Sequence, residues 1–138
     1  MRILAVDPGA KRIGLAVSDP TGTIANPLAV IKHSSRIVDA ATIAQIAAEN
    51  DARTIVVGQS LDQDGKPTVE GRRAARLAAA IRTQTKMEVT LWDEYLSTQT
   101  ALDARRALNA PRKKRQGHLD SLAATVILQS YLDTQKNA

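Results

Sequence analysis

The sequence predicts an α/β protein in which helices flank one mixed five-stranded sheet. Strand patterns dominate the opening of the chain, and helix and strand patterns alternate after it. Antiparallel strands followed by crossover helices are typical of a single mixed sheet with helices on its faces. The chain has 138 residues, of which 43% are hydrophobic, so it can bury one core but hardly two. We therefore expect a single domain over residues 1–138.

The opening segments predict a hairpin and an edge strand. Residues 3–6 are a short apolar run, and residues 12–18 alternate large apolar residues with Gly14 and Ala16. The turn residues Pro8-Gly9-Ala10-Lys11 connect the two. Residues 24–31 predict a third strand, which Pro27 places at the edge of the sheet because proline cannot donate to a neighbouring strand.

The rest of the chain predicts two further strands and four helices. Ser34 or Ser35 can cap a helix that ends near Asn50, and residues 54–58 form a β-branched run typical of a strand buried on both faces. A polar loop at 59–67 precedes a helix over about 68–86 and a strand at 88–92. Ser97 can cap a third helix. A loop at 109–117 and a final helix over about 119–133 complete the chain.

Composition limits the classes of function. The chain carries 19 basic and 14 acidic residues, a net charge of +5, which favours a polyanionic partner, although many ordinary domains are as basic. The aromatic residues are Trp92, Tyr95 and Tyr131, too few for a base-stacking platform. Cysteine is absent, which excludes disulfides and thiolate metal sites. No apolar segment approaches the length of a membrane span, so we expect a cytoplasmic protein without a membrane partner.

Asp7 is the first candidate for chemistry. It ends the first expected strand, and Gly9, Gly14 and Ala16 leave bare backbone beside it. That space can hold an ion or a phosphate, or it can let a helix pack closely. Asp7 also begins Asp-Pro-Gly, which is typical of an ordinary turn.

Asp93-Glu94 is the second candidate. The pair follows the last expected strand, at the edge where open α/β sheets bind ligands. Two acids before a helix also complement its dipole, which is the alternative interpretation.

Asp120 is the third candidate and the most informative. On the final helix it shares one side with apolar Ala124 and Ile127, opposite a polar stripe of Ser121, Thr125 and Gln129. A carboxylate directed toward a core needs a partner, because burying it alone is very costly. Capping of the helix is the alternative role.

Three such carboxylates can share a divalent cation. The two histidines, His33 and His118, lack zinc-type spacing, and oxygen ligands without cysteine suit Mg²⁺ or Mn²⁺. These ions can hold a phosphodiester, activate a water molecule and stabilise the leaving oxygen. The residues therefore favour metal-dependent phosphodiester hydrolysis.

Basic residues near these acids are candidate nucleic-acid contacts. A tract just before Asp120 would add salt-sensitive, sequence-independent affinity for phosphates, although a solvated charge run is the alternative. The full candidate set is Lys11, Arg12, Arg112, Lys113, Lys114, Arg115 and His118.

Three motifs resemble those of one family. The run from Asp7 to Asp19, DPGAKRIGLAVSD, resembles the opening of the YqgF/RuvX family. These are RNase H-like proteins related to Holliday junction resolvases and described as nucleases of pre-16S rRNA. Asp93-Glu94 with Leu96-Ser97-Thr98 and Ala101 is similar to the second motif of the family. The third corresponds to Asp120-Ser-Leu-Ala-Ala with Ile127-Leu128 and Tyr131-Leu132.

The resemblance spans essentially the whole chain, and the combination of motifs is specific although each motif alone is not. It implies an RNase H-like nuclease domain whose acidic triad, catalytic and metal-binding, is Asp7, Glu94 and Asp120.

The chain departs from the family pattern at three places. Tyr95 stands where the family commonly has Arg, Gln59-Ser60-Leu61-Asp62 replaces Leu-Pro-Leu-Asn, and Gly117-His118-Leu119 lacks the usual basic residue before the last Asp. The triad is intact, so these departures concern the contacts to substrate.

Three functional hypotheses follow. The first is a metal-dependent nuclease for structured RNA, such as pre-16S rRNA ends, or for branched DNA; cleavage of a symmetric junction would require a homodimer, whereas rRNA trimming would not. The second, motivated by Tyr95, is a non-catalytic nucleic-acid-binding or ribosome-assembly factor on the same fold. The third is a nucleotide-binding module of the sugar-kinase and actin type, which normally needs two such domains.

Overall fold

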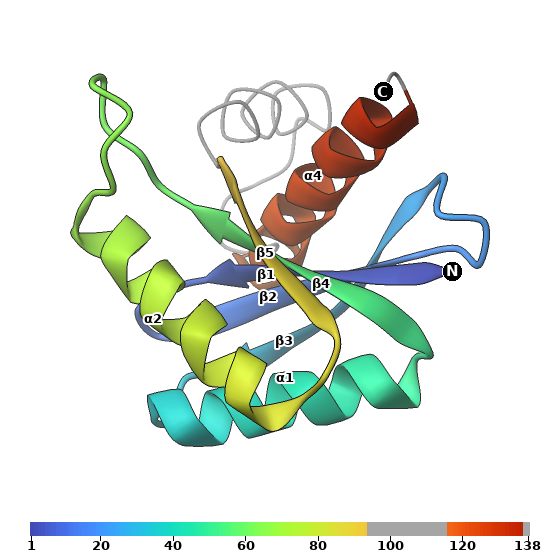
Figure 1. Ribbon diagram of the computed structural model, residues 1–138, viewed down its shortest axis with the longest axis horizontal. Coiled ribbons are helices and arrows are strands. Elements are labelled where there is room, and N and C mark those ends of the chain that lie inside the picture. Colours follow the sequence, from blue (N-terminus) through green and yellow to red (C-terminus); the bar gives the residue numbers. More distant parts are fainter. Residues whose placement is uncertain (94–115, 137–138) are drawn as a thin grey trace.

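The computed structural model describes residues 1–93 and 116–136, which form one sheet with helices on both faces (Figure 1). The strands are β1 (Arg2–Pro8), β2 (Arg12–Ser18), β3 (Ala25–Lys32), β4 (Ala52–Gln59) and β5 (Glu88–Asp93). The helices are α1 (Arg36–Glu49), α2 (Val69–Gln84) and α4 (Gln116–Lys136).

The five strands lie in the order β3-β2-β1-β4-β5, so β1 is central. β3, β2 and β1 pair antiparallel, whereas β1, β4 and β5 pair parallel. The mixed five-stranded sheet expected from the sequence is confirmed, and so is the position of β3 at the edge.

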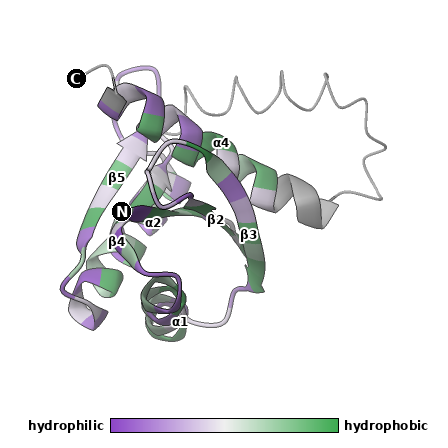
Figure 2. Ribbon diagram, turned by 90° about the vertical axis from the view of Figure 1, so that its right-hand side faces the viewer, coloured by the Kyte–Doolittle hydropathy of each residue, from purple (hydrophilic) through white to green (hydrophobic). Residues whose placement is uncertain are grey.

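The two faces of the sheet carry cores of different size. α1 and α2 cover one face and α4 covers the other (Figures 1 and 2). Under α1 and α2 lie large apolar side chains, including Leu4, Val6, Leu15, Ile55 and Val57. Under α4 the sheet contributes smaller residues, and the cluster consists of Ala5, Ala16, Val56, Ala124, Ile127, Leu128 and Leu132.

Local signals explain where the helices on the first face begin. The hydroxyl of Ser35 accepts a hydrogen bond from the backbone N–H of Val38 and caps α1. Thr68 caps α2 in the same way through the N–H of Gly71, at 3.1 Å. β4 is buried on both faces, as its β-branched run predicts.

The C-terminal helix begins earlier than expected. α4 starts at Gln116 rather than near Leu119, so Gln116 and Gly117 belong to the helix and not to a loop at 109–117. Glycine lowers helix propensity, but packing of the following turns against a sheet outweighs a local preference of about 1 kcal/mol. The rest of that loop and the helix expected after Ser97 lie outside the described residues. No described helix has the length and apolar character needed to span a membrane.

Gly58 lets α4 approach the sheet. A Cβ atom on Gly58 would lie 2.7 Å from Cδ1 of Ile127 and 3.6 Å from the carbonyl oxygen of Val6. Ala5 and Ala16, which pair across β1 and β2, are fully buried under the same helix. Close helix packing therefore accounts for Ala16, one of the small residues noted beside Asp7.

We predict that Gly58→Ala lowers the free energy of unfolding by about 1–3 kcal/mol, because the added methyl group overpacks the contact with Ile127. Ile127→Val, which removes Cδ1, should cost about 0.5–1.5 kcal/mol by itself. In the double variant the losses should be less than additive. Urea denaturation of the four proteins measures these terms, and strictly additive losses would contradict the contact.

Candidate active site

Asp7 lies near the carboxyl end of β1, in the middle of the sheet, and is half-buried. Side chains alternate between the two faces of a strand, and Ala5, two residues earlier, packs under α4. The carboxylate of Asp7 therefore lies on the face that α4 covers. The residue paired with Asp7 on β2 is Gly14, so the directly opposed position contributes no side chain.

The neighbouring strand ends meet at the same edge. β1, β4 and β5 are parallel, so Pro8, Gln59 and Asp93 end their strands on one side of the sheet. This is the edge at which open α/β sheets bind ligands. The sequence predicts that at least one residue of the Asp93-Glu94 pair lies at the carboxyl end of a strand, and Asp93 is the last residue of β5.

Alternation along β5 separates the two acids of the pair. Leu91 packs against the core under α1 and α2, whereas Trp92 packs against the cluster under α4. Asp93 has the parity of Leu91, so its carboxylate lies on the face opposite that of Asp7. Glu94 lies outside the described residues.

The first turns of α4 lie over the strand end that carries Asp7. The hydroxyl of Ser121 donates to the carbonyl oxygen of Leu15 at 3.4 Å, and Leu15 pairs with Val6, the residue before Asp7. The backbone of Asp120 belongs to α4 directly before Ser121, whereas its side chain lies outside the description. The fold thus brings Asp120 and Asp7 to the same part of the sheet at the level of the backbone.

The sequence pattern places the polar stripe of α4 on the side opposite the core. This prediction is wrong for Ser121 and Gln129, which contact the sheet. Ser121 is 8% exposed, and the Gln129 amide donates to the carbonyl of Thr23 and accepts from the N–H of Ala25. These side chains satisfy backbone groups of β2, β3 and the loop between them. Sequence reasoning missed Ser121 as a positioning residue, although its three- and seven-residue spacing from buried Ala124 and Leu128 indicated the inner side.

Trp92 ties the end of β5 to α4. Its indole N–H donates to the hydroxyl of Ser130 at 2.9 Å, and its ring meets that of Tyr131 edge to face, with centroids 5.3 Å apart. Burial raises the pKa of Tyr131, and the charge of Glu88 raises it further.

The described residues hold part of the candidate set. Of the predicted triad, the side chain of Asp7 is described. Among the described residues, no three His, Asp or Glu side chains gather as a metal site. Lys11, in the turn after β1, and Arg12, the first residue of β2, are both exposed. The tract from Arg112 to Arg115 and the side chain of His118 lie outside the described residues.

Comparison with known proteins decides the family. The model of the RuvX family, described as Holliday junction resolvase, matches residues 1–134. The chain belongs to the RuvX family. It is thus a member of a nuclease family, as the first sequence hypothesis held, and this membership disfavours the nucleotide-binding module.

Curated relatives match this RuvX-family chain over its full length. A protein of Thermoanaerobacter pseudethanolicus named "Putative pre-16S rRNA nuclease" is 40% identical, covering 99% of both chains. A protein of Caldanaerobacter subterraneus with the same name is 37% identical, covering 100% of both.

Solved resolvases share the fold of the RuvX-family chain. Thermus thermophilus RuvC in complex with a Holliday junction substrate superposes with a TM-score of 0.62 at 17% identity, covering 100% of this chain and 97% of that one. The fowlpox virus resolvase with Holliday junction DNA gives 0.60 at 13% identity, covering 98% and 99%. These similarities confirm the RNase H-like fold.

We predict that the stability of the protein falls at alkaline pH through Tyr131. The folded-state pKa lies above the ordinary value of about 10, so the contribution of the neutral phenol is complete below that value and is lost as pH rises through the folded pKa. Tyr131→Phe should therefore lose less stability than the parent protein above pH about 10. Urea midpoints across the alkaline range test this. Parallel pH profiles for the two proteins would refute it.

Proposed function

We propose that this RuvX-family protein is a single-domain, metal-dependent nuclease that hydrolyses phosphodiester bonds in structured nucleic acid. The observation that carries the proposal is the placement of Asp7: its carboxylate lies at the carboxyl edge of the central strand, opposite Gly14, where α4 begins. Gly14, opposite the half-buried Asp7, contributes no side chain that would obstruct a cation or a phosphate at this position.

We propose Asp7, Glu94 and Asp120 as the catalytic ligands of Mg²⁺ or Mn²⁺. The fit rests on the chemistry of the donors, because the chain lacks cysteine and the described strand end offers carboxylate oxygen. A bound ion of this kind would stabilise charge on the phosphate and lower the pKa of a water molecule. Asp7 pairs with Gly14 on β2, and Val6 before it pairs with both β2 and β4, so the backbone at this position is held by the sheet, which suits a ligand that must keep its geometry.

The basic residues around this edge would bind the substrate through its phosphates. Lys11 in the β1–β2 turn and Arg12 at the start of β2 are exposed and would hold the nucleic-acid strand without reading its bases. The same role is proposed for the side chains of Arg112, Lys113, Lys114, Arg115 and His118.

Pre-16S rRNA is the proposed substrate, with DNA junctions as the alternative. The relatives named for pre-16S rRNA are 37% to 40% identical to this chain, whereas the resolvases are 13% to 17% identical and bear on the fold alone. Trimming of an RNA end needs one active site, so a monomer suffices, while a symmetric junction would need a homodimer. We propose the cytoplasm as its location, where rRNA precursors of bacteria occur.

We predict that Asp7→Asn cuts pre-16S rRNA at least about a hundredfold more slowly than the parent protein, because a metal ligand stabilises several kcal/mol of transition-state charge. Asp93→Asn is the matched control: the same change lies at the same edge but on the opposite face, and cleavage should persist. Single-turnover cleavage with Mg²⁺ or Mn²⁺, on RNA bearing the precursor ends and on a DNA junction, measures both. Chelation of the metal should abolish the activity, and added metal should restore it.

Undiminished cleavage by Asp7→Asn would exclude Asp7 from the catalytic site. Parent protein that binds the RNA but cuts neither substrate with either ion would instead support a non-catalytic assembly factor, the alternative that Tyr95 motivates.

A further inference from the structure

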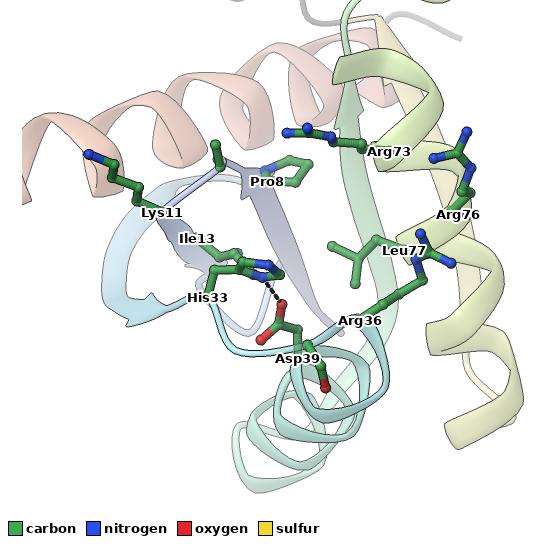
Figure 3. Close-up of a pocket in the computed structure, with 12 residues that line it drawn as sticks. Pro8, Lys11, Ile13, His33, Arg36, Asp39, Arg73, Arg76 and Leu77 are labelled. Atoms are coloured by element: carbon green, nitrogen blue, oxygen red, sulfur yellow. Dashed lines mark hydrogen bonds and ion pairs between the residues drawn. The ribbon is translucent and has the colours of Figure 1, made fainter. Parts of the chain in front are cut away.

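A basic pocket lies on the other side of the strand end that carries Asp7. Its volume is about 590 Å³, and it opens between the β1–β2 turn, the start of α1 and the first half of α2 (Figure 3). Its apolar wall contains Ile13 and Leu77, which belong to the core under α1 and α2. The pocket is therefore on the face opposite the carboxylate of Asp7.

Four permanent cations line this pocket. Lys11 comes from the β1–β2 turn, Arg36 from α1, and Arg73 and Arg76 from α2. In Figure 3 the side chain of Arg73 extends from α2 toward Pro8, and that of Arg36 extends from α1 toward Leu77. Among the described residues these four side chains make no ion pair and no hydrogen bond. Like charges repel one another, so an anion bound between them would relieve an unfavourable arrangement.

The acidic residue lining the pocket is already engaged. Asp39 is 3% exposed, and its two oxygens accept hydrogen bonds from Nδ1 of His33 at 2.5 Å and from the backbone N–H of Ser34 at 3.0 Å. This carboxylate orients the His33 ring, whose other nitrogen, Nε2, is left for a ligand. The four cations therefore give the pocket a positive charge, which favours an anionic ligand.

We propose that this pocket binds a phosphate of the nucleic-acid strand that is being cut, next to the scissile phosphate along the chain. The proposal rests on the proposed nuclease function and extends it to the opposite face of the sheet. Pro8 lines the pocket and directly follows Asp7, and consecutive Cα atoms are about 3.8 Å apart. The β1–β2 turn therefore separates the two sites, and we propose that a strand with one phosphate at Asp7 crosses this turn and has a neighbouring phosphate among the arginines.

The lining favours a strand phosphate over a free nucleotide. Arginine guanidinium groups suit phosphate oxygens because they donate two parallel hydrogen bonds. No described lining residue is a Trp, Tyr or Phe, so a base finds no aromatic ring to stack on. Ile13 and Leu77 offer an apolar surface against which a sugar can pack. Such a site contributes affinity and register without reading sequence.

The test compares two adjacent arginines of α2. Arg73 lines the pocket, whereas Arg72 does not and instead donates to the carbonyl of Pro67 at 3.3 Å. Both are exposed, so Arg73→Gln and Arg72→Gln remove the same charge without disturbing the core. Fluorescence anisotropy with full-length protein, a labelled RNA hairpin bearing a single-stranded extension, and chelator to prevent cleavage gives the affinity across a salt series.

Arg73→Gln should bind the RNA about tenfold more weakly, and its plot of log affinity against log salt should be shallower by about 0.7–0.9, the value of one phosphate contact. Arg36→Gln should behave similarly, while Arg72→Gln should stay within about twofold of the parent protein. Equal losses for Arg72→Gln and Arg73→Gln would indicate diffuse attraction by α2 and would overturn the proposal. An unchanged Arg73→Gln would overturn it as well.

Inorganic pyrophosphate distinguishes a free anion from a strand. Pyrophosphate binding by calorimetry that depends on Arg73, combined with RNA affinity that does not, would assign the pocket to a free ligand and overturn the proposal.

The same experiments separate the pocket from the nuclease function. If the parent protein cleaves RNA and Arg73→Gln binds RNA as tightly as the parent, the nuclease function is supported and the phosphate site in the pocket is contradicted. RNA affinity that depends on Arg73 in a protein that never cuts would support a phosphate site in the pocket, but would contradict the nuclease function and the assignment of that phosphate to a strand being cut. A parent protein that binds no nucleic acid contradicts both.

Discussion

The arrangement of the site depends on how closely α4 approaches the sheet. Ala5, Ala16 and Gly58 keep the side chains small on part of the face under α4, and Ile127 occupies the space that a Cβ of Gly58 would need. A helix seated this low places its first turns against β2, where Ser121 reaches a backbone carbonyl. The small residues thus serve two purposes, because the helix contact that stabilises the fold also brings the start of α4 to the end of the central strand.

Much of this arrangement could be predicted because it depends on local or periodic signals. A serine before a helix can cap it with its own hydroxyl, as Ser35 does for α1. A proline cannot donate to a neighbouring strand, which favours the edge position of β3 with Pro27. The start of α4 could not be placed, since packing against the sheet overrides the poor helix propensity of Gly117. The role of Ser121 could not be predicted either. Serine is a polar residue, which predicts the solvent side, and the backbone carbonyl that accepts its hydroxyl hydrogen is identified only when the pairing of the strands is known.

The end of β1 separates two chemical environments. Alternation directs Asp7 toward α4, whereas Pro8, the next residue, lines a pocket surrounded by Arg36, Arg73 and Arg76. Motif analysis finds Asp7, because a carboxylate before Pro-Gly at a strand end is local. It does not find the basic pocket, because Arg36 is far in sequence from Arg73 and Arg76 and lies near them only when α1 and α2 pack side by side on the sheet. An acidic metal site and a basic phosphate site on opposite faces of the sheet would hold one nucleic-acid strand on both sides of the β1–β2 turn.

Broadening of amide NMR signals by Mn²⁺ tests directly whether Asp7 holds the catalytic ion. We expect the strongest broadening at Asp7, Gly14 and Ser121, the residues that meet at this strand end, and its loss in Asp7→Asn. Broadening centred on other carboxylates, such as Asp62 and Asp64 in the β4–α2 loop, or a pattern unchanged in Asp7→Asn, would contradict it.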